Sequence, residues 1–134
     1  MGIFDIFKKK KELPLEAQQW NKMWNLWTED KIESPYKELM TYQSEVNNGG
    51  HSQYFCNIES NNDARSEINK VKKLLSKDLQ ENIEKAYKAY QKLEEVEDIE
   101  SEEILEECDN LYYEKESEIN DILEEFSSKI EIQK

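Results

Sequence analysis

The chain has 134 residues, of which 31 are Asp or Glu and 18 are Lys or Arg, so its formal net charge is −13. This length suits one domain with its own apolar core, and no apolar run approaches the ~18 residues that a membrane helix needs. The acidic balance disfavours direct binding to nucleic acid, because phosphates repel such a surface. Three Trp and seven Tyr argue against intrinsic disorder, since disordered chains are poor in aromatic residues.

Residues 1–12 are predicted to form a short flexible N-terminal tail, in which a small apolar cluster precedes Lys8 to Lys11. A secretory signal has the opposite order, with its basic residues first. Contact of residues 1–11 with a membrane surface is an alternative, but we expect no membrane association. Because no export signal is recognised, Cys56 and Cys108 are expected to be reduced and the protein to be cytoplasmic.

Residues 13–134 are predicted to form a single all-α domain. Val and Thr together number only five, and no segment alternates apolar and polar residues as a strand does. A second helix is predicted to open at Pro35 and to end at Asn47-Asn48-Gly49-Gly50, since Gly suits a helix C-cap. The first helix carries an apolar stripe at helical spacing, formed by Trp20, Met23, Trp24 and Trp27.

Further short helices are predicted after this break, the first of them from Ser52 to Ile58. We expect a cap for the next helix at Asn61 to Asp63, a capping box at Asp78 with Glu81, and a cap at Ser101. Residues 94–100 are expected to form a link before two separate C-terminal helices, whose apolar stripes run from Ile104 to Tyr112 and from Ile119 to Ile130. The result is a compact bundle of about six short amphipathic helices, which are stabilised by burying their apolar stripes together.

The acidity lies almost entirely in the predicted C-terminal helices. Residues 94–131 hold 17 acids and two bases, a net charge of −15, whereas residues 1–93 have a net charge of +1. If residues 94–131 form a helical hairpin ~28 Å long, they carry roughly one acid per 1.7 Å, the axial charge density of duplex DNA. The candidate binding residues are Glu102, Glu103, Glu106, Glu107, Glu114, Glu118, Asp121, Glu124 and Glu125.

Catalytic and metal-binding groups are few. The single histidine, His51, could pair with Cys56 or Cys108, but the sequence indicates no third group to orient it. Two Cys and one His fall short of the four ligands of a structural zinc site. We therefore expect no enzyme activity, no metal and no cofactor, and keep a catalytic site at the Asn-Gly-Gly sequence as an alternative.

Amides, glycines and aromatic residues are concentrated at the predicted helix break. One interpretation is a structural corner, in which side-chain amides satisfy the free backbone groups of two helix ends. The other is a ligand notch with Tyr54 and Phe55 as its floor. The residues of this motif are Glu45, Asn47, Asn48, Gly49, Gly50, Gln53, Tyr54, Phe55 and Asn57.

The string Glu-Val-Asn-Asn-Gly-Gly-x-x-Gln-Tyr-Phe-x-Asn resembles the signature of a bacterial family of DNA-mimic-protein-like domains of largely unknown function. A second match is Leu111-Tyr112-Tyr113 after Asp109, and the resemblance covers roughly residues 36–126. The chain departs from the pattern at His51, where the family is expected to have an aromatic residue such as Phe. The resemblance implies an all-helical, often dimeric fold without catalysis. In the mimic, acidic side chains stand in for DNA phosphates and occupy a transcription regulator.

We therefore expect a non-enzymatic acidic binding protein that occupies a basic protein, such as a DNA-binding regulator, through its acidic C-terminal surface. One alternative is a helical protein-interaction or immunity-type module, in which Tyr54, Phe55 and Trp27 would anchor a partner in an aromatic groove. Another is an uncharacterised structural domain. Binding through charge should weaken with salt, whereas binding through an aromatic groove should persist.

Overall fold

The computed structural model of the protein describes residues 13–61 and 63–132, so the predicted tail at residues 1–12 lies outside the described part. These ranges contain five helices and no strand, which confirms the all-α class but gives one helix fewer than predicted. The helices are α2 (Leu15–Thr28), α3 (Tyr36–Asn61), α4 (Ala64–Lys72), α5 (Lys77–Glu95) and α6 (Ile99–Ser127).

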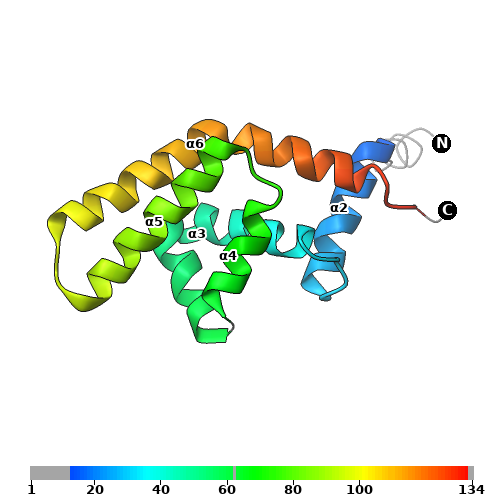
Figure 1. The fold of residues 1–134 in the computed structure, drawn as a ribbon. Coiled ribbons are helices and arrows are strands. Elements are labelled where there is room, and N and C mark those ends of the chain that lie inside the picture. The colour runs from blue at the N-terminus through cyan, green and yellow to red at the C-terminus, as the bar shows by residue number, and fades with distance from the viewer. Residues whose placement is uncertain (1–12, 62, 133–134) are drawn as a thin grey trace, which may run out of the picture.

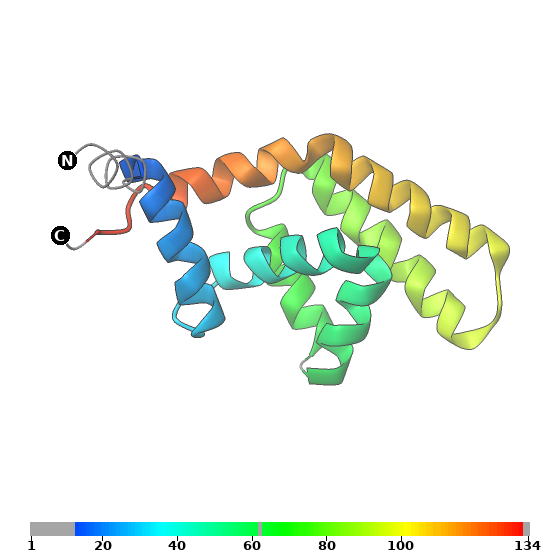
Figure 2. The same cartoon turned by 180° about the vertical axis from the view of Figure 1, so that it is seen from behind.

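The longest helix, α6, runs along one edge of the molecule and pairs antiparallel with α5 (Figure 1). The other helices lie along this hairpin: α3 and α4 pack below it, and α2 crosses the C-terminal end of α6 (Figure 2). Gln19 on α2 fixes this crossing, because its side-chain amide donates hydrogen bonds to the carbonyls of Ser128 and Ile130 at 3.0 and 2.9 Å. These carbonyls follow the last turn of α6, where backbone acceptors have no helical partner.

One apolar core joins all five helices. Large side chains are fully buried on α2, on both halves of α3 and on α4, α5 and α6, and each contributes roughly 1.5–3 kcal/mol to folding by leaving water. The stripe predicted for the first helix is confirmed at Met23, while the three tryptophans beside it are half-buried. The largest fully buried side chains include Met23, Leu39, Met40, Tyr42, Tyr54, Phe55, Ile68, Leu79, Ile83, Tyr112, Ile119 and Leu123.

Helix α3 consists of two helical segments joined by a kink at Gly49 and Gly50. The backbone leaves helical geometry at both residues, with φ −156° and ψ 22° at Gly49 and φ 76° and ψ −178° at Gly50. Only glycine adopts the second conformation without strain. The predicted break is therefore confirmed, and the helical segment predicted after it continues to Asn61.

The start of α4 was predicted correctly and the start of α5 was not. Asp63 is the N-cap of α4, and its carboxylate accepts a hydrogen bond from the backbone N–H of Ser66 at 3.3 Å. The capping box predicted at Asp78 and Glu81 is wrong, because α5 begins two residues earlier, with Ser76 at the N-cap position. Asp78 lies instead in the first turn, where its negative charge is favourable at the positive end of the helix dipole.

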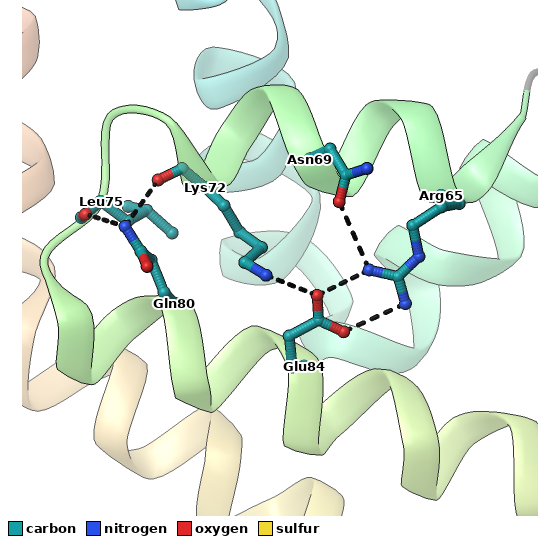
Figure 3. Close-up of polar contacts among 6 residues, drawn as sticks. All are labelled: Arg65, Asn69, Lys72, Leu75, Gln80 and Glu84. Atoms are coloured by element: carbon teal, nitrogen blue, oxygen red, sulfur yellow. Dashed lines mark hydrogen bonds and ion pairs between the residues drawn. The ribbon is translucent and has the colours of Figure 1, made fainter.

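A carboxylate on α5 ties α4 to the hairpin (Figure 3). Glu84 accepts a bidentate pair of hydrogen bonds from Arg65 at 2.6 and 3.0 Å and a third from Lys72 at 2.7 Å. These hydrogen bonds, with the positive charges of their donors, hold the pKa of Glu84 at about 2. Gln80 closes the same connection by donating to the carbonyls of Lys72 and Leu75.

Two predictions about α6 are wrong. Its N-cap is Asp98, whose carboxylate accepts hydrogen bonds from the Glu100 backbone and from the Ser101 hydroxyl at 3.3 and 2.7 Å. The two predicted C-terminal helices are one continuous helix of 29 residues. No Gly or Pro occurs at residues 113–118, where Glu and Lys favour helix. The gap in the apolar stripe marks a polar contact with α3 rather than a helix end, since Glu116 accepts a hydrogen bond from Asn47.

Candidate functional site

The outer face of α6 carries a row of carboxylates, which we call the acidic ridge. It lies opposite the buried stripe of the helix, and at about 100° per residue its members fall within roughly 60° of one another. All are exposed except Glu118, which is half-buried, and Glu102, Glu106 and Glu124 form a second exposed row beside them. The ridge consists of Glu103, Glu107, Glu114, Glu118, Asp121 and Glu125.

Cations neutralise little of the acidic ridge within the described part of the chain. The ridge has one ion pair there, between Glu107 and Lys85 at 3.8 Å, and both side chains are more than half exposed. Such exposed pairs contribute about 0–1 kcal/mol. The Ser76 hydroxyl donates to Glu118 at 3.4 Å, and the single lysine of α6, Lys115, pairs with Asp78 on α5 instead. The nine predicted acidic positions therefore lie together on one helix with most of their charge unopposed.

The charge density of this surface is lower than predicted, because α6 pairs with the nearly neutral α5 and not with a second acidic helix. The 12 acids of α6 lie along ~43 Å of helix, or one per ~3.6 Å. This is close to the charge spacing of one DNA strand along the axis, ~3.4 Å, and half the density of the duplex. Helix α6 as a whole therefore resembles one phosphate strand in linear charge, while the six acids of the ridge alone are spaced at about one per 6 Å.

The Asn-Gly-Gly corner faces α6 through its second glycine. A Cβ atom added to Gly50 would lie 2.6 Å from Oδ2 of Asp109, so only a hydrogen atom fits between the α3 backbone and this carboxylate. A Cβ on Gly49 would meet the flexible amide end of the Gln53 side chain and would lie 3.0 Å from Gln53 Cβ. The two glycines therefore have different roles. The absence of a side chain at Gly50 lets α6 pack closely against α3, and its absence at Gly49 leaves room for Gln53 in the next turn of the same helix.

A buried hydrogen-bonded chain runs through the corner. Asp109 Oδ1 accepts from the backbone N–H of His51 at 2.9 Å and lies 2.6 Å from His51 Nδ1, while His51 Nε2 lies 2.7 Å from the Tyr42 hydroxyl. His51 and Tyr42 are fully buried, and burial raises the pKa of the Tyr42 phenol well above its usual range. Asp109 is thus the orienting group for His51 that the sequence had not indicated, because 58 residues separate the two.

The amides of the motif hold the corner together on its surface side. Gln53 and Asn57 both donate side-chain hydrogen bonds to Glu45 Oε2, which joins the segments before and after the kink. Asn47 donates to Glu116 on α6 at 2.8 Å, and Asn48 is exposed. This arrangement supports the interpretation of a structural corner.

The second stretch that resembles the family lies against the first. In addition to Asp109, Tyr113 donates to the carbonyl of Val46 at 3.1 Å, and the buried Tyr112 ring packs edge-on against Tyr42. Residues 45–57 and 109–116 are therefore two sides of one contact between α3 and α6.

The ligand notch and the aromatic groove predicted at Tyr54 and Phe55 are not present, because both side chains are buried. Tyr54 and Phe55 are fully buried, so they form neither the floor of a ligand notch nor anchors for a partner in an aromatic groove. Their rings pack instead against Tyr42 and Tyr87. Trp27 is half-buried, and its indole N–H donates to Thr41 at 3.0 Å.

The two cysteines differ in exposure. Cys108 is buried, and burial raises the pKa of its thiol to about 11, whereas Cys56 is exposed. No group of three or more His, Cys, Asp or Glu side chains is arranged to hold a metal ion within residues 13–61 and 63–132. Among the helices described, none is long and apolar enough to cross a bilayer.

Comparison with known proteins agrees with the motif. A family model described as DMP19-like protein matches residues 36–131, which include both sides of the α3–α6 contact and the whole acidic ridge. Neither the curated proteins nor the solved structures contain a match. Because the family model covers more than half of the chain, the protein belongs to the DMP19-like protein family.

Proposed function

We propose that this protein is a non-enzymatic binding protein whose acidic ridge occupies the DNA-binding surface of a basic protein. The observation that carries the proposal is the row of exposed carboxylates on α6, which extends ~33 Å from Glu103 to Glu125 on one helix face. Membership of the DMP19-like family supports a role of the DNA-mimic type.

The distribution of charge also supports this function. Most lysines of the hairpin region lie on α4 and α5, at positions such as Lys72, Lys77 and Lys88, rather than on the outer face of α6. Dispersed acids paired with lysines would suffice for solubility, but a one-sided row produces a directed field that attracts a basic surface. The acids of α6 together offer charge at about the spacing of one DNA strand, and the ridge aligns half of them on one face, so we expect a partner to place one row of Lys or Arg side chains along it.

The test compares two variants with the same net charge. The ridge variant carries Glu103→Lys, Glu107→Lys and Glu114→Lys. The control variant carries three charge reversals at exposed acids outside α6, at Glu29, Glu33 and Glu81. Each set adds six charge units, so both variants have a formal net charge of −7 instead of −13.

Each protein is immobilised and used to capture proteins from a lysate of the source cells. Wild type and control should retain the same DNA-binding protein at about 0.1 M salt, where charges interact over ~10 Å, and lose it near 1 M, where that range is ~3 Å. Added duplex DNA should release it, and the ridge variant should not capture it. Equal capture by the ridge variant, or no DNA-binding protein captured at low salt, refutes the proposal. Light scattering on the same samples tests the expectation of a homodimer.

A further inference from the structure

A stripe of uncharged residues, which we call the uncharged stripe, lies beside the acidic ridge on the outer face of α6. Its members are exposed, and at about 100° per residue they fall within roughly 60° of one another. The stripe lies on the side of the ridge that faces α3, where Tyr113 donates to the Val46 carbonyl. A partner that covers the ridge therefore also contacts the stripe. The uncharged stripe consists of Ile99, Asn110, Tyr113 and Ser117.

Tyr113 is the only exposed aromatic side chain in residues 13–61 and 63–132, and it is 47% exposed. Its hydroxyl donates to the Val46 carbonyl at 3.1 Å, and its ring lies edge-on to the buried ring of Tyr112, with the centroids 5.3 Å apart. A ring that is already fixed in this way loses little conformational freedom when a partner covers it. Tyr113 also lies near the middle of α6 and of its ridge, and tyrosines at the centre of an interface often contribute most of the binding energy.

Another tyrosine of the chain shows which group suits a phenol ring beside a carboxylate. The guanidinium of Arg65 on α4 lies 5.4 Å from the centroid of the Tyr87 ring on α5. The same guanidinium donates two hydrogen bonds, at 2.6 and 3.0 Å, to Glu84, which precedes Tyr87 by three residues (Figure 3). Among the described residues, no cation lies over the ring of Tyr113. The arrangement at Tyr113 therefore lacks the cation that completes the one at Tyr87.

The surroundings of Tyr113 leave room for such a cation. The residues one turn before and one turn after it, Asn110 and Ser117, are short, uncharged and exposed. Exposed carboxylates lie close by, since Glu114 is the next residue of the ridge and Glu106 lies two turns before Tyr113. A guanidinium group suits this position better than an ammonium group, because its flat face stacks on an aromatic ring while its edge donates to a carboxylate.

We propose that Tyr113 is the central anchor of the acidic surface and binds an arginine side chain of the basic partner. The guanidinium group stacks on the Tyr113 ring, and the carboxylates of Glu106 and Glu114 pair with it. This inference rests on the proposed function and deepens it, because it names the residue that the partner places at the middle of its basic row. The ridge attracts the partner through charge that salt screens, whereas the stacked ring distinguishes arginine from lysine.

The test measures the affinity of the full chain for hexa-arginine and hexa-lysine, two peptides of equal charge, each labelled with fluorescein and followed by fluorescence anisotropy. Wild type should bind hexa-arginine more tightly than hexa-lysine. In Tyr113→Leu this preference should fall about two- to fivefold, the range for a cation stacked on an exposed ring, whereas Tyr113→Phe should keep it. Both variants lose the hydrogen bond to Val46, so they differ in the aromatic face of the side chain.

Controls separate this inference from the proposed function. Leu15→Ala, at an exposed apolar residue of α2, should change neither affinity, and circular dichroism checks that each variant is folded. The ridge variant described above should bind both peptides about tenfold or more weakly at low salt. An unchanged arginine preference in Tyr113→Leu, or an equal loss of it in Tyr113→Phe, overturns the anchor and leaves the ridge in place. Equal binding of both peptides by the ridge variant and wild type refutes the proposed function instead, and a loss of the arginine preference in Tyr113→Leu then still supports the anchor.

Discussion

Substitution of Gly50 tests the account of the Asn-Gly-Gly corner. In Gly50→Ala, the new methyl group would lie 2.6 Å from Asp109 Oδ2 and 3.2 Å from its Cγ, on a backbone with φ 76°. The strained conformation costs about 1–3 kcal/mol, and displacing Asp109 sacrifices its charge-assisted hydrogen bonds to His51, worth about 1.5–3 kcal/mol. We therefore expect a loss of about 2.5–6 kcal/mol, a large part of the 5–15 kcal/mol typical of a domain.

The assay is urea unfolding followed by tryptophan fluorescence and circular dichroism, with Gly49→Ala as the matched control. Gly49 has φ −156°, outside the left-handed region, and its new methyl group would meet the movable amide end of Gln53 and lie 3.0 Å from Gln53 Cβ, where a small shift relieves the contact. Moving Gln53 loses one hydrogen bond to Glu45, so the expected cost is only about 1 kcal/mol. A smaller loss for Gly50→Ala than for Gly49→Ala would refute the role assigned to the second glycine.

A double-mutant cycle then isolates the contact with α6. In an Asp109→Ala background the carboxylate that the methyl group would meet is gone, so Gly50→Ala should cost only the conformational part, about 1–3 kcal/mol. If the two losses simply add, Gly50 and Asp109 do not interact, and the close approach is not the reason for a glycine at this position.

Three further predictions concern other parts of the fold. The pKa of Glu84 is about 2, below its ordinary value of 4.5, so its contribution to stability is complete above pH 4.5 and is lost as the pH falls towards 2. Glu84→Gln should flatten this part of the pH–stability curve and lower the free energy of unfolding by about 1 kcal/mol at neutral pH, after screening by solvent. Urea unfolding across the acid range measures both effects. An unchanged curve would show that the donors to Glu84 do not stabilise the fold. In the native protein at pH 8, iodoacetamide should modify the exposed Cys56, whereas Cys108 should react only after unfolding. Mass spectrometry of the labelled peptides distinguishes the two cysteines. Labelling of Cys108 in the native protein would contradict its burial. Gln19→Ala should release the end of α6 and so speed amide hydrogen exchange at residues 128–130, while exchange in the middle of α6 stays unchanged. Equal exchange in the variant and in wild type would mean that Gln19 does not hold this end.

Local signals in the sequence were enough to predict most of the fold. Apolar periodicity and the scarcity of β-branched residues indicated helices, and the paired glycines placed the break in α3 at the residues where it occurs. The boundary errors have a common cause, since several polar residues near each helix start could act as a cap. Ser76 and Asp98 hold these positions, rather than Asp78 and Ser101. A gap in the apolar stripe wrongly predicts a break in α6, because a polar contact through Glu116 takes the place of apolar packing there.

The candidate site was predictable to the extent that it is local. Acids at helical spacing are visible in the sequence, so the clustering of the nine acidic positions could be predicted, but the charge density around them depends on which helix lies beside α6. The pairing of His51 with Asp109 joins distant parts of the chain, and the only signal for it was that both lie within stretches that resemble the family. The sequence alone does not show whether Tyr54 and Phe55 are buried or lie on an exposed aromatic surface. An amphipathic pattern shows which residues share a helix face, but not whether another helix covers that face.

The corner and the acidic ridge depend on each other through the rotation of α6 about its axis. Two acids of this helix, Asp109 and Glu116, face α3 and are held there by His51, Gln43 and Asn47. Because successive residues turn by about 100°, fixing these two positions fixes the direction of every other acid on the helix. A rotation of α6 by one residue would turn the ridge towards the neighbouring helices and bury carboxylates without partners. The free-energy cost would exceed the stability of a small domain. The corner that identifies the family thus has a physical reason to occur together with the acidic surface, since it orients that surface outward.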